Sequence, residues 1–506
     1  MTERKKPSYE FNKSKTKTPM REQAPEERIK NFDEVPLGFS CDEATAEGQR
    51  CIQCKKRPCV DGCPVGVDIP AFMNLVGEGL YEEALRKVKE KNFLPAICGR
   101  VCPQEDQCEL VCTMNKPDKG REPGGVGRVE RFLGDYAMEH DLNVLPPKEP
   151  DSGKSVAIIG SGPAGLTAAS DLIQKGHDVT VFEALHRPGG VLFYGIPEFR
   201  LPKKILIKEI DGLKDMGVKF VMNYPVGKAE SLNSIRERFD AVFIGVGAGL
   251  PWFMGIPGEN LNGVYSANEF LTRVNLMGGY QFPDKADTPI KKIRRIAVIG
   301  GGNVAMDAAR TAKRLDPDHV YLIYRRTKAE LPARIEESHH AAQEFIDFQL
   351  LHAPVEIIGE NGAVKAIRCQ EMELGEPDDS GRRRPVPIEG AFKTWEVDTV
   401  VVAIGQGPNP VLTADCPELE LNARRGTIVV QDEQTMHTNL DNVWAGGDIV
   451  TGGATVILAM GAGRNAATSI HEYLMSESGV TAREAGATRT PASPGDARRR
   501  TPPRPP

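Results

Sequence analysis

The sequence predicts an α/β protein in which two Rossmann-like dinucleotide-binding domains follow an all-α domain with packed cysteines. Three observations predict this fold class. Eight of the 11 cysteines fall within residues 51–112. An apolar strand, a glycine-rich turn and a helix follow one another within 156–175, and the same order returns within 295–314. The 506 residues are enough for three to four domains of roughly 150 residues each.

Composition excludes several functional classes. Hydrophobic residues make up 40% and charged residues 26% of the chain, which excludes extensive disorder and a membrane-embedded protein. The formal net charge of -6 creates no field that would gather nucleic acid or anionic lipid, so we expect neither as a partner. Residues 1–30 contain no apolar signal segment, and no run of about 18 apolar residues occurs, so we expect a cytoplasmic protein.

The amino-terminal part carries the cysteines. Residues 1–40 form a polar extension, of which we expect 1–30 to be mobile, and the helical cysteine domain covers 41–145. Its thiols occur in two groups of four, each with a Cys-Pro step: Cys51, Cys54, Cys59 and Cys63, then Cys98, Cys102, Cys108 and Cys112. A reducing cytosol disfavours disulfides, so metal binding is the expected use. The close spacing favours iron-sulfur clusters, with structural zinc as the alternative.

The first nucleotide motif follows a stiff proline-rich linker at 145–150. A strand at 156–159 enters the turn GSGPAG, a helix covers 166–175, and a second strand at 178–182 ends in an acid. The glycines allow a tight turn, close approach of a diphosphate and helix packing, while the acid accepts hydrogen bonds from a ribose diol. The motif predicts FAD or NAD at Gly160, Gly162, Gly165 and Glu183.

The second motif differs at the residues that decide nucleotide choice. A strand at 295–299 enters the turn GGGNVA, a helix covers 306–314, and the strand at 320–324 ends in Arg325 and Arg326. Two guanidiniums bind a 2'-phosphate and offer no acceptor to a diol. This site therefore predicts NADPH, with a solvated strand end as the alternative interpretation of the arginines.

Two further apolar strands, at 400–405 and 443–448, run into glycine, and a small-residue helix at 455–469 follows the second of them. Gly447 and Asp448 at that second strand end place a carboxylate for a ribitol hydroxyl, and the helix start faces an electron-rich ring edge. Beyond this helix, the Pro, Ala and Arg composition predicts a disordered tail over 476–506.

The order of these motifs resembles one family. After the two cysteine groups and the first glycine turn come GGVLFYGIPEFRLPK at 189–203, the second glycine turn, and AGGD at 445–448. Residues 30–475 thereby resemble the small (beta) subunit of NADPH-dependent glutamate synthase and its FAD- and iron-sulfur-dependent NAD(P)H oxidoreductase relatives. Those relatives include the large subunit of the bifurcating NADH-dependent ferredoxin:NADP oxidoreductase and the amino-terminal half of dihydropyrimidine dehydrogenase.

The resemblance implies two 4Fe-4S clusters with interleaved ligands. One cluster would be held by Cys51, Cys54, Cys59 and Cys112. The other would be held at three corners by Cys63, Cys102 and Cys108. In the relatives, a Gln or Glu after a glycine-containing turn supplies the fourth corner, which nominates Glu130, while spacing alone nominates Cys98. Glu130 as a simple helix-start carboxylate is a further alternative.

The resemblance also implies an adrenodoxin-reductase-like flavoprotein. Its FAD-binding domain would consist of residues 151–290 and 406–475, with an NADPH-binding domain inserted at 291–405. The FAD positions are matched by Gly160, Gly162, Gly165, Glu183, Gly190, Gly447 and Asp448. The NADPH positions are matched by Gly300, Gly302, Asn303, Arg325, Arg326 and Arg334.

The expected function is electron input. NADPH delivers a hydride whereas an iron-sulfur cluster accepts one electron at a time, so a flavin is needed between them. We therefore expect a glutamate synthase small subunit that works with a large catalytic chain, and we assign no catalytic residue. The alternatives are the bifurcating oxidoreductase subunit, with a ferredoxin or flavoprotein partner, and a non-catalytic iron-sulfur scaffold.

Overall fold

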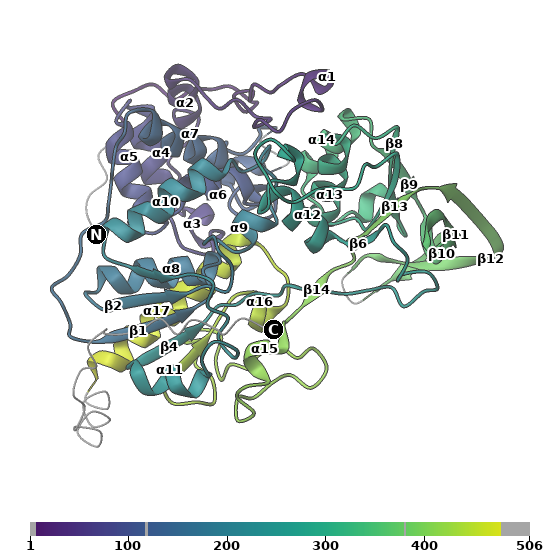
Figure 1. Ribbon diagram of the computed structural model, residues 1–506. Helices are drawn as coiled ribbons and strands as arrows, with labels where there is room; N and C mark the ends of the chain where they lie inside the picture. Colours follow the sequence, from purple (N-terminus) through teal and green to yellow (C-terminus); the bar gives the residue numbers. More distant parts are fainter. Residues whose placement is uncertain (1–6, 117–119, 379–380, 477–506) are drawn as a thin grey trace.

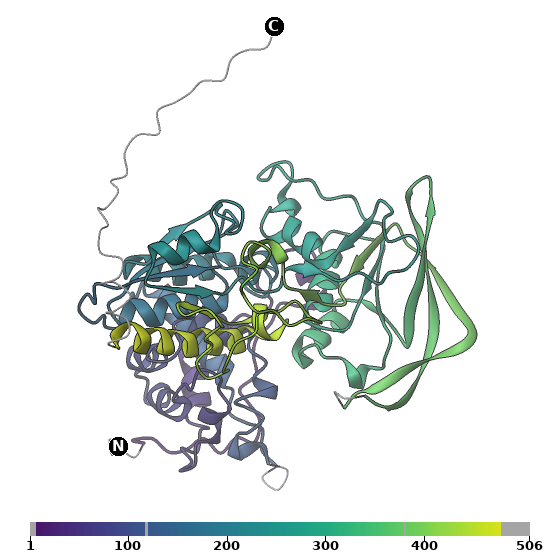
Figure 2. The same cartoon turned by 90° about the horizontal axis from the view of Figure 1, so that it is seen from below.

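The computed structural model describes residues 7–116, 120–378 and 381–476, so the predicted tail lies outside the described residues except for residue 476. Figures 1 and 2 show a helical amino-terminal domain, two α/β domains, and a long antiparallel sheet at the outer end of the second α/β domain. The predicted fold class is confirmed: a helical domain precedes two parallel sheets.

The cysteine-rich domain is all helical. Its elements are α1 (Pro25–Arg28), α2 (Cys41–Gly48), α3 (Pro58–Asp61), α4 (Ile69–Gly77), α5 (Tyr81–Lys89), α6 (Pro95–Val101), η1 (Gln104–Asp106), η2 (Thr113–Asn115) and α7 (Val126–Glu139). The helical spacing of apolar residues between α4 and α5 is interrupted at Gly79, whose φ of +75° suits glycine and ends a helix. The buried faces of α4 to α7 form the core of this domain.

The amino-terminal arm, residues 7–40, packs against distant parts of the chain rather than being mobile as expected for 1–30. The side chain of Arg28 is 1% exposed, and its Nε donates to Oε1 of Glu344 at 2.9 Å. Phe32 stacks on Tyr280 with ring centroids 4.0 Å apart. The arm is held by a few side chains whose partners lie some 300 residues further along the chain. Local composition cannot reveal such contacts, so the expectation of mobility was wrong for the described part of the arm.

The first α/β domain is a five-stranded parallel sheet in the order β15-β4-β1-β2-β3. Its strands are β1 (Ser155–Ile159), β2 (Asp178–Phe182), β3 (Lys219–Val221), β4 (Ala241–Ile244) and β15 (Val443–Ala445). Its helices are α8 (Pro163–Gln174), α9 (Val191–Tyr194), α10 (Lys203–Asp215), α11 (Leu232–Arg238), α15 (Pro410–Thr413), α16 (Asp448–Thr451) and α17 (Val456–Met475). The edge strand β15 returns from a later stretch, so two separated stretches build this sheet.

The second α/β domain repeats this parallel arrangement in the order β6-β13-β7-β8-β9. Its strands are β6 (Val264–Ser266), β7 (Arg295–Ile299), β8 (His319–Tyr324), β9 (Asp347–Leu350) and β13 (Thr399–Val402). Its helical elements are α12 (Ala267–Asn275), η4 (Gly279–Gln281), α13 (Asn303–Lys313), η5 (Lys328–Glu330) and α14 (Ile335–Gln343). Because β6 pairs with β13, this sheet begins before the predicted boundary at residue 291; a three-residue strand gives too short a pattern to recognise.

An antiparallel meander, which the sequence did not predict, covers one face of the second sheet. It consists of β10 (His352–Glu360), β11 (Ala363–Pro377) and β12 (Arg383–Glu396). Its Ile367 and Trp395 share a core with Ala297 of β7 and Val400 of β13. The two α/β domains are joined by a pair of short antiparallel strands, β5 (Leu250–Pro251) and β14 (Gln406–Gly407).

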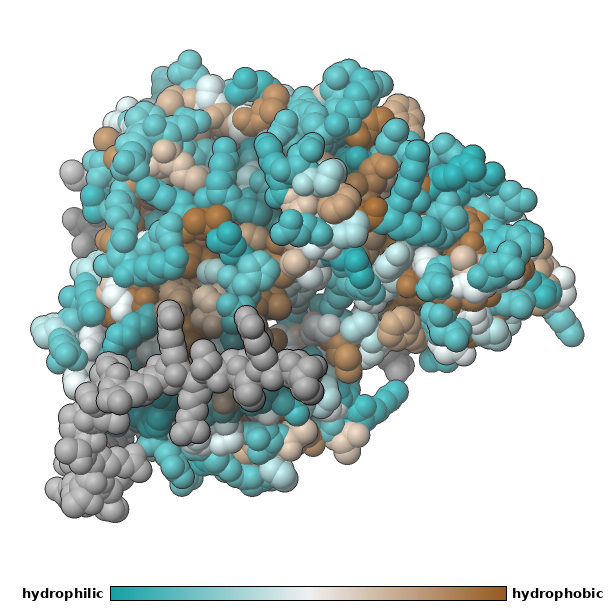
Figure 3. Space-filling model, in the orientation of Figure 1, coloured by the Kyte–Doolittle hydropathy of each residue, from teal (hydrophilic) through white to brown (hydrophobic). Residues whose placement is uncertain are grey.

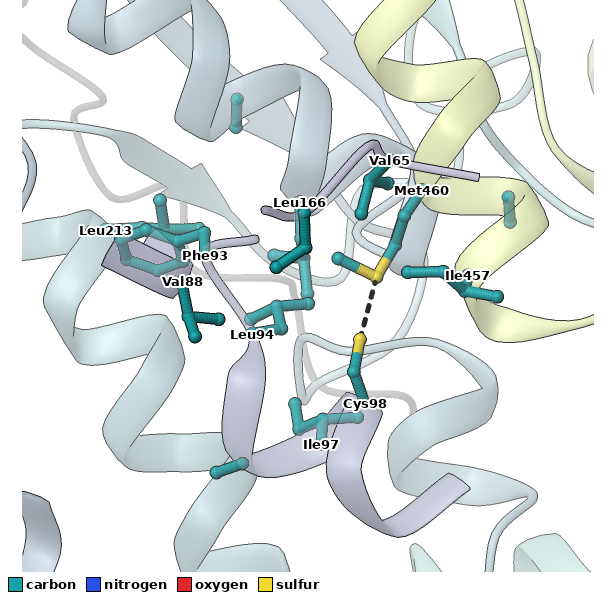
Figure 4. Packing of buried hydrophobic residues seen from close by; sticks show 14 of the residues in the cluster. Val65, Val88, Phe93, Leu94, Ile97, Cys98, Leu166, Leu213, Ile457 and Met460 are labelled. Atoms are coloured by element: carbon teal, nitrogen blue, oxygen red, sulfur yellow. Dashed lines mark hydrogen bonds between the residues drawn. The ribbon is translucent and has the colours of Figure 1, made fainter. Parts of the chain in front are cut away.

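The helical domain and the first sheet share one hydrophobic core. Figure 4 shows Leu94 and Cys98 of the helical domain facing Leu166 of α8 and Met460 of α17. The thiol groups therefore lie against the domain that carries the first glycine turn. The two parts form a single packed unit.

A buried charge network joins the second domain to its neighbours. Arg310 and Arg314 of α13 both donate to Glu344, with the shortest distances 2.8 and 2.7 Å, and Arg28 of the arm binds the same carboxylate. Burial alone would raise the pKa of Glu344, but the two α13 guanidiniums lower it to about 2. Arg200 of the first domain donates from Nη1 to both carboxylate oxygens of Asp307, at 2.8 and 2.7 Å.

Candidate functional site

A cleft of about 1720 Å³ lies between the two sheets. Both glycine turns, at Gly160 and Gly300, line it, as do Asp448 and Arg325. In each sheet the strand before the turn lies between the next strand along the chain and a strand that returns from later in the sequence. Ligands of such sheets bind at the carboxyl ends of the strands, where the strand order reverses. The cleft therefore lies where dinucleotides are expected.

The first glycine turn is shaped for a diphosphate. A Cβ on Gly165 would lie 2.0 Å from the carbonyl oxygen of Gly160, so the helix packs too closely on the turn for any larger residue. A Cβ on Gly162 would meet no atom within 4 Å, because that residue faces the cleft. Gly162 precedes α8 and no side chain caps the helix, so its first N–H groups are available to an anion.

The second turn has the same construction. Gly300 has a φ of +144°, and a Cβ there would lie 2.3 Å from the carbonyl oxygen of Ala403. Gly302 is open like Gly162, and α13 starts behind it without a side-chain cap. The Asn303 side chain accepts a hydrogen bond from the backbone N–H of Arg334 at 2.9 Å, which fixes the start of the helix.

The acids predicted for the flavin side lie in the first domain's part of the cleft. Glu183 is 6% exposed and accepts hydrogen bonds from the backbone N–H groups of Ser161 at 3.0 Å and Leu185 at 2.8 Å. Asp448 follows Gly447 at the start of α16, and burial raises the pKa of its carboxyl. Tyr194 lines the same cleft, and burial together with the charges of Asp448 and Glu183 raises its pKa to about 12.

Gly190 belongs to this part of the cleft as well. Its φ is +54°, and a Cβ there would lie 3.0 Å from the Cα of Gly162. The short helix α9 that follows carries Tyr194, which lies within the sequence motif but was not predicted as a site residue. A partly buried tyrosine that lines a cleft has no sequence signal apart from its position in the motif.

The predicted arginines have different surroundings. Arg325 is exposed, lines the cleft, and makes no hydrogen bond or ion pair with other described residues. Arg326 is 5% exposed, and its Nη2 donates to Asp378 at 2.6 Å and its Nε to the carbonyl of Arg383 at 2.7 Å. Arg326 therefore holds the meander against the domain, while Arg325 is available to a ligand. Arg382, the residue before β12 and absent from the predicted set, also lines the cleft.

Arg334 was predicted to bind NADPH, but its side chain points away from the cleft. Its Nη2 donates to Oε1 of Gln104 at 3.1 Å, and its Nη1 donates to the carbonyl of Arg100 at 3.1 Å. Its Nε lies 3.3 Å from Oε1 of Glu105. The reason is that η1 of the helical domain occupies the space in front of it. Arg334 is thus an interdomain contact.

Cys51, Cys54, Cys59 and Cys112, the ligands that the resemblance implies for one cluster, lie near one another and are called the outer thiol group. Burial raises the pKa of Cys59 to about 12, and the neighbouring thiols of Cys51, Cys112 and Cys54 add to this rise. The hydroxyl of Thr113, the residue after Cys112, lies 3.3 Å from the Cys54 sulfur, so the chain brings Cys112 close to Cys54. Free thiolates would be disfavoured there, whereas iron bound to the sulfurs would stabilise them, so the donor set fits a cluster.

The inner thiol group consists of Cys63, Cys102 and Cys108, of which the last two are buried, and it has two candidates for its fourth ligand. Burial raises the pKa of Cys63 and of Cys108, and the charge of Glu130 raises both further. Burial also raises the pKa of Glu130 to about 8, against a hydrogen bond from Asn92 at 2.7 Å. Cys98 is 1% exposed, and its Sγ lies 3.5 Å from the Met460 sulfur (Figure 4).

Comparison with known families agrees with this arrangement. Residues 28–142 match the family described as dihydropyrimidine dehydrogenase domain II, 4Fe-4S cluster. Residues 154–463, more than half of the chain, match the pyridine nucleotide-disulphide oxidoreductase family. The chain belongs to the pyridine nucleotide-disulphide oxidoreductases. Within this family it carries an amino-terminal 4Fe-4S domain.

Individual members of this oxidoreductase family are similar over most of the chain. The glutamate synthase [NADPH] small chain of Azospirillum brasilense is 36% identical over 452 residues, which cover 88% of this chain and 92% of that one. The NADP(+)-dependent formate dehydrogenase subunit beta of Moorella thermoacetica is 39% identical over 440 residues, which cover 82% of this chain. The match spans 60% of the formate dehydrogenase subunit, less than two thirds of its length.

The solved structures support the fold. FprA from Mycobacterium tuberculosis in complex with NADPH has a TM-score of 0.53 at 20% identity, covering 68% of this chain and 88% of that chain.

The family matches and the similar small chains show that the chain is an FAD- and NADPH-dependent oxidoreductase with 4Fe-4S chemistry, as predicted. The number of clusters and the individual ligands stay predictions.

Surface hydropathy and helix length were compared with what a membrane-spanning protein requires. The face in view in Figure 3 is mostly hydrophilic, with hydrophobic residues in small separate groups. Within the described parts of the chain, no helix combines the length and the apolar character needed to cross a bilayer.

Matched substitutions test the two open glycines. Gly162→Ala adds a methyl group where the protein has space, so the chain should fold normally but lose FAD affinity, and Gly302→Ala should weaken NADPH alone. Crowding of this kind costs about 1–3 kcal/mol, or roughly 5- to 150-fold in binding. Flavin absorbance per folded chain and the KM for NADPH are the measurements. Full flavin content in Gly162→Ala would place the diphosphate elsewhere.

Proposed function

We propose that the chain is the electron-input subunit of a glutamate synthase and works with a large catalytic partner chain. The observation that carries this proposal is the wall of the cleft: Val101 and Pro103 line it, and Cys102 lies between them in the sequence. Cys102 of the inner thiol group therefore lies directly behind the nucleotide cleft. When bound, FAD would serve as the acceptor of a hydride from NADPH, and 4Fe-4S clusters would serve as one-electron carriers.

The residues of the chain have binding and positioning roles in this proposal. Arg325 holds the 2'-phosphate of NADPH, and the open glycines Gly162 and Gly302 admit the two diphosphates. Glu183 and Asp448 accept hydroxyl hydrogen bonds from the flavin nucleotide. Hydride transfer itself requires no protein acid or base, so no side chain is assigned that role.

Seven cysteines and one further ligand hold two 4Fe-4S clusters in this proposal. Cys51, Cys54, Cys59 and Cys112 bind the outer one, and Cys63, Cys102 and Cys108 bind the inner one. Its fourth ligand is Glu130 or Cys98, since both lie within electrostatic reach of the inner thiols. The small-chain relatives of glutamate synthase, such as the one from Azospirillum brasilense, support the assignment to that enzyme.

The formate dehydrogenase relative supports a second candidate, in which the same site passes electrons in the opposite direction, to NADP+. The co-purifying chain distinguishes the two. A large glutamate-forming partner supports the first candidate, and a formate-oxidising partner supports the second.

The experiment distinguishes the reduction of the flavin by NADPH from the transfer of electrons through the clusters. The isolated chain should hold about eight iron and eight sulfide, reduce ferricyanide with NADPH, and form no glutamate from glutamine and 2-oxoglutarate. Cys54→Ala should lose about half of the iron, while rapid mixing with NADPH still bleaches the flavin at the native rate. Zinc in place of iron, glutamate formation by the pure chain, or loss of flavin reduction in folded, FAD-loaded Cys54→Ala would contradict the proposal.

A further inference from the structure

The outer thiol group lies under a surface with exposed apolar side chains. Ile52, next to Cys51, is 38% exposed. Leu110 and Val111, just before Cys112, are 56% and 41% exposed. Isolated exposed apolar residues are common, but these three flank two cysteines of the same group. We call the surface formed by Ile52, Leu110 and Val111 the thiol face.

The thiol face is firmly held to the thiols beneath it. A Cβ added to Gly62 would lie 2.6 Å from Cγ2 of Val111, so Val111 packs directly on the turn that precedes Cys63. The hydroxyl of Thr113, the residue after Cys112, donates to the Cys54 sulfur at 3.3 Å. The exposed side chains therefore sit on a fixed part of the domain.

The two thiol groups differ in their access to solvent. Three of the four outer cysteines, Cys51, Cys54 and Cys112, are partly exposed, and Cys59 is buried. In the inner group only Cys63 is partly exposed; Cys102 and Cys108 are 6% and 7% exposed, and the neighbours of Cys102 line the cleft. The outer group is thus the one that a second protein could approach, and the thiol face is the surface it would touch.

The rim of the thiol face is basic although the chain as a whole carries -6. Lys55 and Lys56, between Cys54 and Cys59, are exposed, and so is Lys116 after η2. The arm adds exposed Lys13 and Lys15, whose segment is fixed by hydrogen bonds to the residues around Gln49 and Glu122. Exposed acids in the same segments are Glu10, Asp61, Asp106 and Glu122, fewer than the five exposed lysines. An apolar centre within a basic rim complements an acidic surface.

We propose that the thiol face docks an acidic iron-sulfur protein or subunit, which presents an apolar centre ringed by carboxylates. This inference rests on the proposed function, because it assigns the exit surface for the same electrons. Each NADPH supplies two electrons, so it reduces two partner molecules in turn. NADPH becomes NADP+ and releases one proton, and the oxidised cluster of each partner molecule gains one electron. The oxidant is the partner's own iron-sulfur cluster.

Charge reversal at the rim tests the proposal with a defined probe. The probe is an acidic 2Fe-2S ferredoxin whose reduction potential lies above that of NADPH. Lys55→Glu/Lys56→Glu should weaken ferredoxin binding to the holoprotein and slow its reduction about tenfold at low salt, and the difference should shrink as salt screens the charges. Leu110→Ser should weaken binding with little salt dependence. Calorimetric Kd and the rate of ferredoxin reduction are the two measurements.

Control variants carry the same changes elsewhere: Lys285→Glu/Lys292→Glu and Leu421→Ser, at exposed positions of the α/β domains. They should leave ferredoxin binding unchanged, and all variants should reduce ferricyanide with NADPH at the native rate. Basic cytochrome c should be a poor acceptor that improves on charge reversal. Equal effects of control and thiol-face variants, no effect of either, or preference for cytochrome c would overturn the docking proposal alone. Failure of the native chain to reduce ferricyanide with NADPH would overturn the proposed function, and docking with it.

Discussion

Replacing Glu344 with glutamine should destabilise the folded chain by about 3–5 kcal/mol, because three guanidiniums would lose the one carboxylate that they share in the interior. Arg28, Arg310 and Arg314 all bind Glu344, and the side chains of Arg310, Arg314 and Glu344 are fully buried. The free energy of unfolding by urea, followed through the first transition, is the measurement. Retained flavin absorbance would show that the variant still folds.

Two controls make this result specific to burial. Glu360→Gln, in the exposed pair of Glu360 with Lys365, should cost less than about 1 kcal/mol. The folded-state pKa of Glu344 is lowered from 4.5 to about 2, so its contribution is present above pH 4.5 and is lost as the pH falls toward 2. The difference between native and Glu344→Gln chains should therefore be constant from neutral pH down to 4.5 and shrink below it. A difference that grows on acidification would contradict this account.

Arg325→Gln should raise the KM for NADPH by about 10- to 140-fold and leave that for NADH unchanged. A charge-assisted phosphate contact contributes roughly 1.5–3 kcal/mol, and NADH lacks the phosphate. Steady-state ferricyanide reduction with each nucleotide measures the effect. The guanidinium of Arg325 is exposed and lines the cleft, so its loss should leave the melting temperature unchanged.

The adjacent Arg326 provides the comparison. Arg326→Gln removes the bonds to Asp378 and to the Arg383 carbonyl, so the melting temperature should fall because the meander is less firmly attached. Its effect on the NADPH to NADH ratio should be the smaller of the two. If Arg326→Gln abolishes the preference and Arg325→Gln does not, the two roles are reversed.

Local signals in the sequence were sufficient for the parts of the fold that form within a short stretch. Each glycine turn, its helix and its flanking strands lie within about thirty residues, as the βαβ unit requires, so spacing alone identified both. The roles of Arg325 and Arg326 could not be separated in this way. Their different surroundings come from the meander, whose Asp378 lies 52 residues further along the chain.

Contacts between distant segments account for the remaining differences. Arg334 follows the NADPH motif, but the helical domain supplies its partners Gln104 and Glu105. The ligand of the inner thiol group was ambiguous for a related reason. Asn92 bonds Glu130 and approaches the Cys98 sulfur at 3.7 Å, so both candidates converge on one place from different helices.

The strand pair β5–β14 and the amino-terminal arm together constrain how the second domain can move. Two chain crossings that lie side by side behave as a single hinge, about which a domain could swing. The arm attaches to the same domain through Arg28 and Phe32, and Figure 1 shows α1 beside α14, at the other end of that domain from β14. The second α/β domain is thus attached at the strand pair and again through the arm, so it cannot rotate about the strand pair unless the arm moves with it. The arm therefore limits how far the second α/β domain can rotate about the strand pair, together with the buried Arg200–Asp307 contact between the two α/β domains.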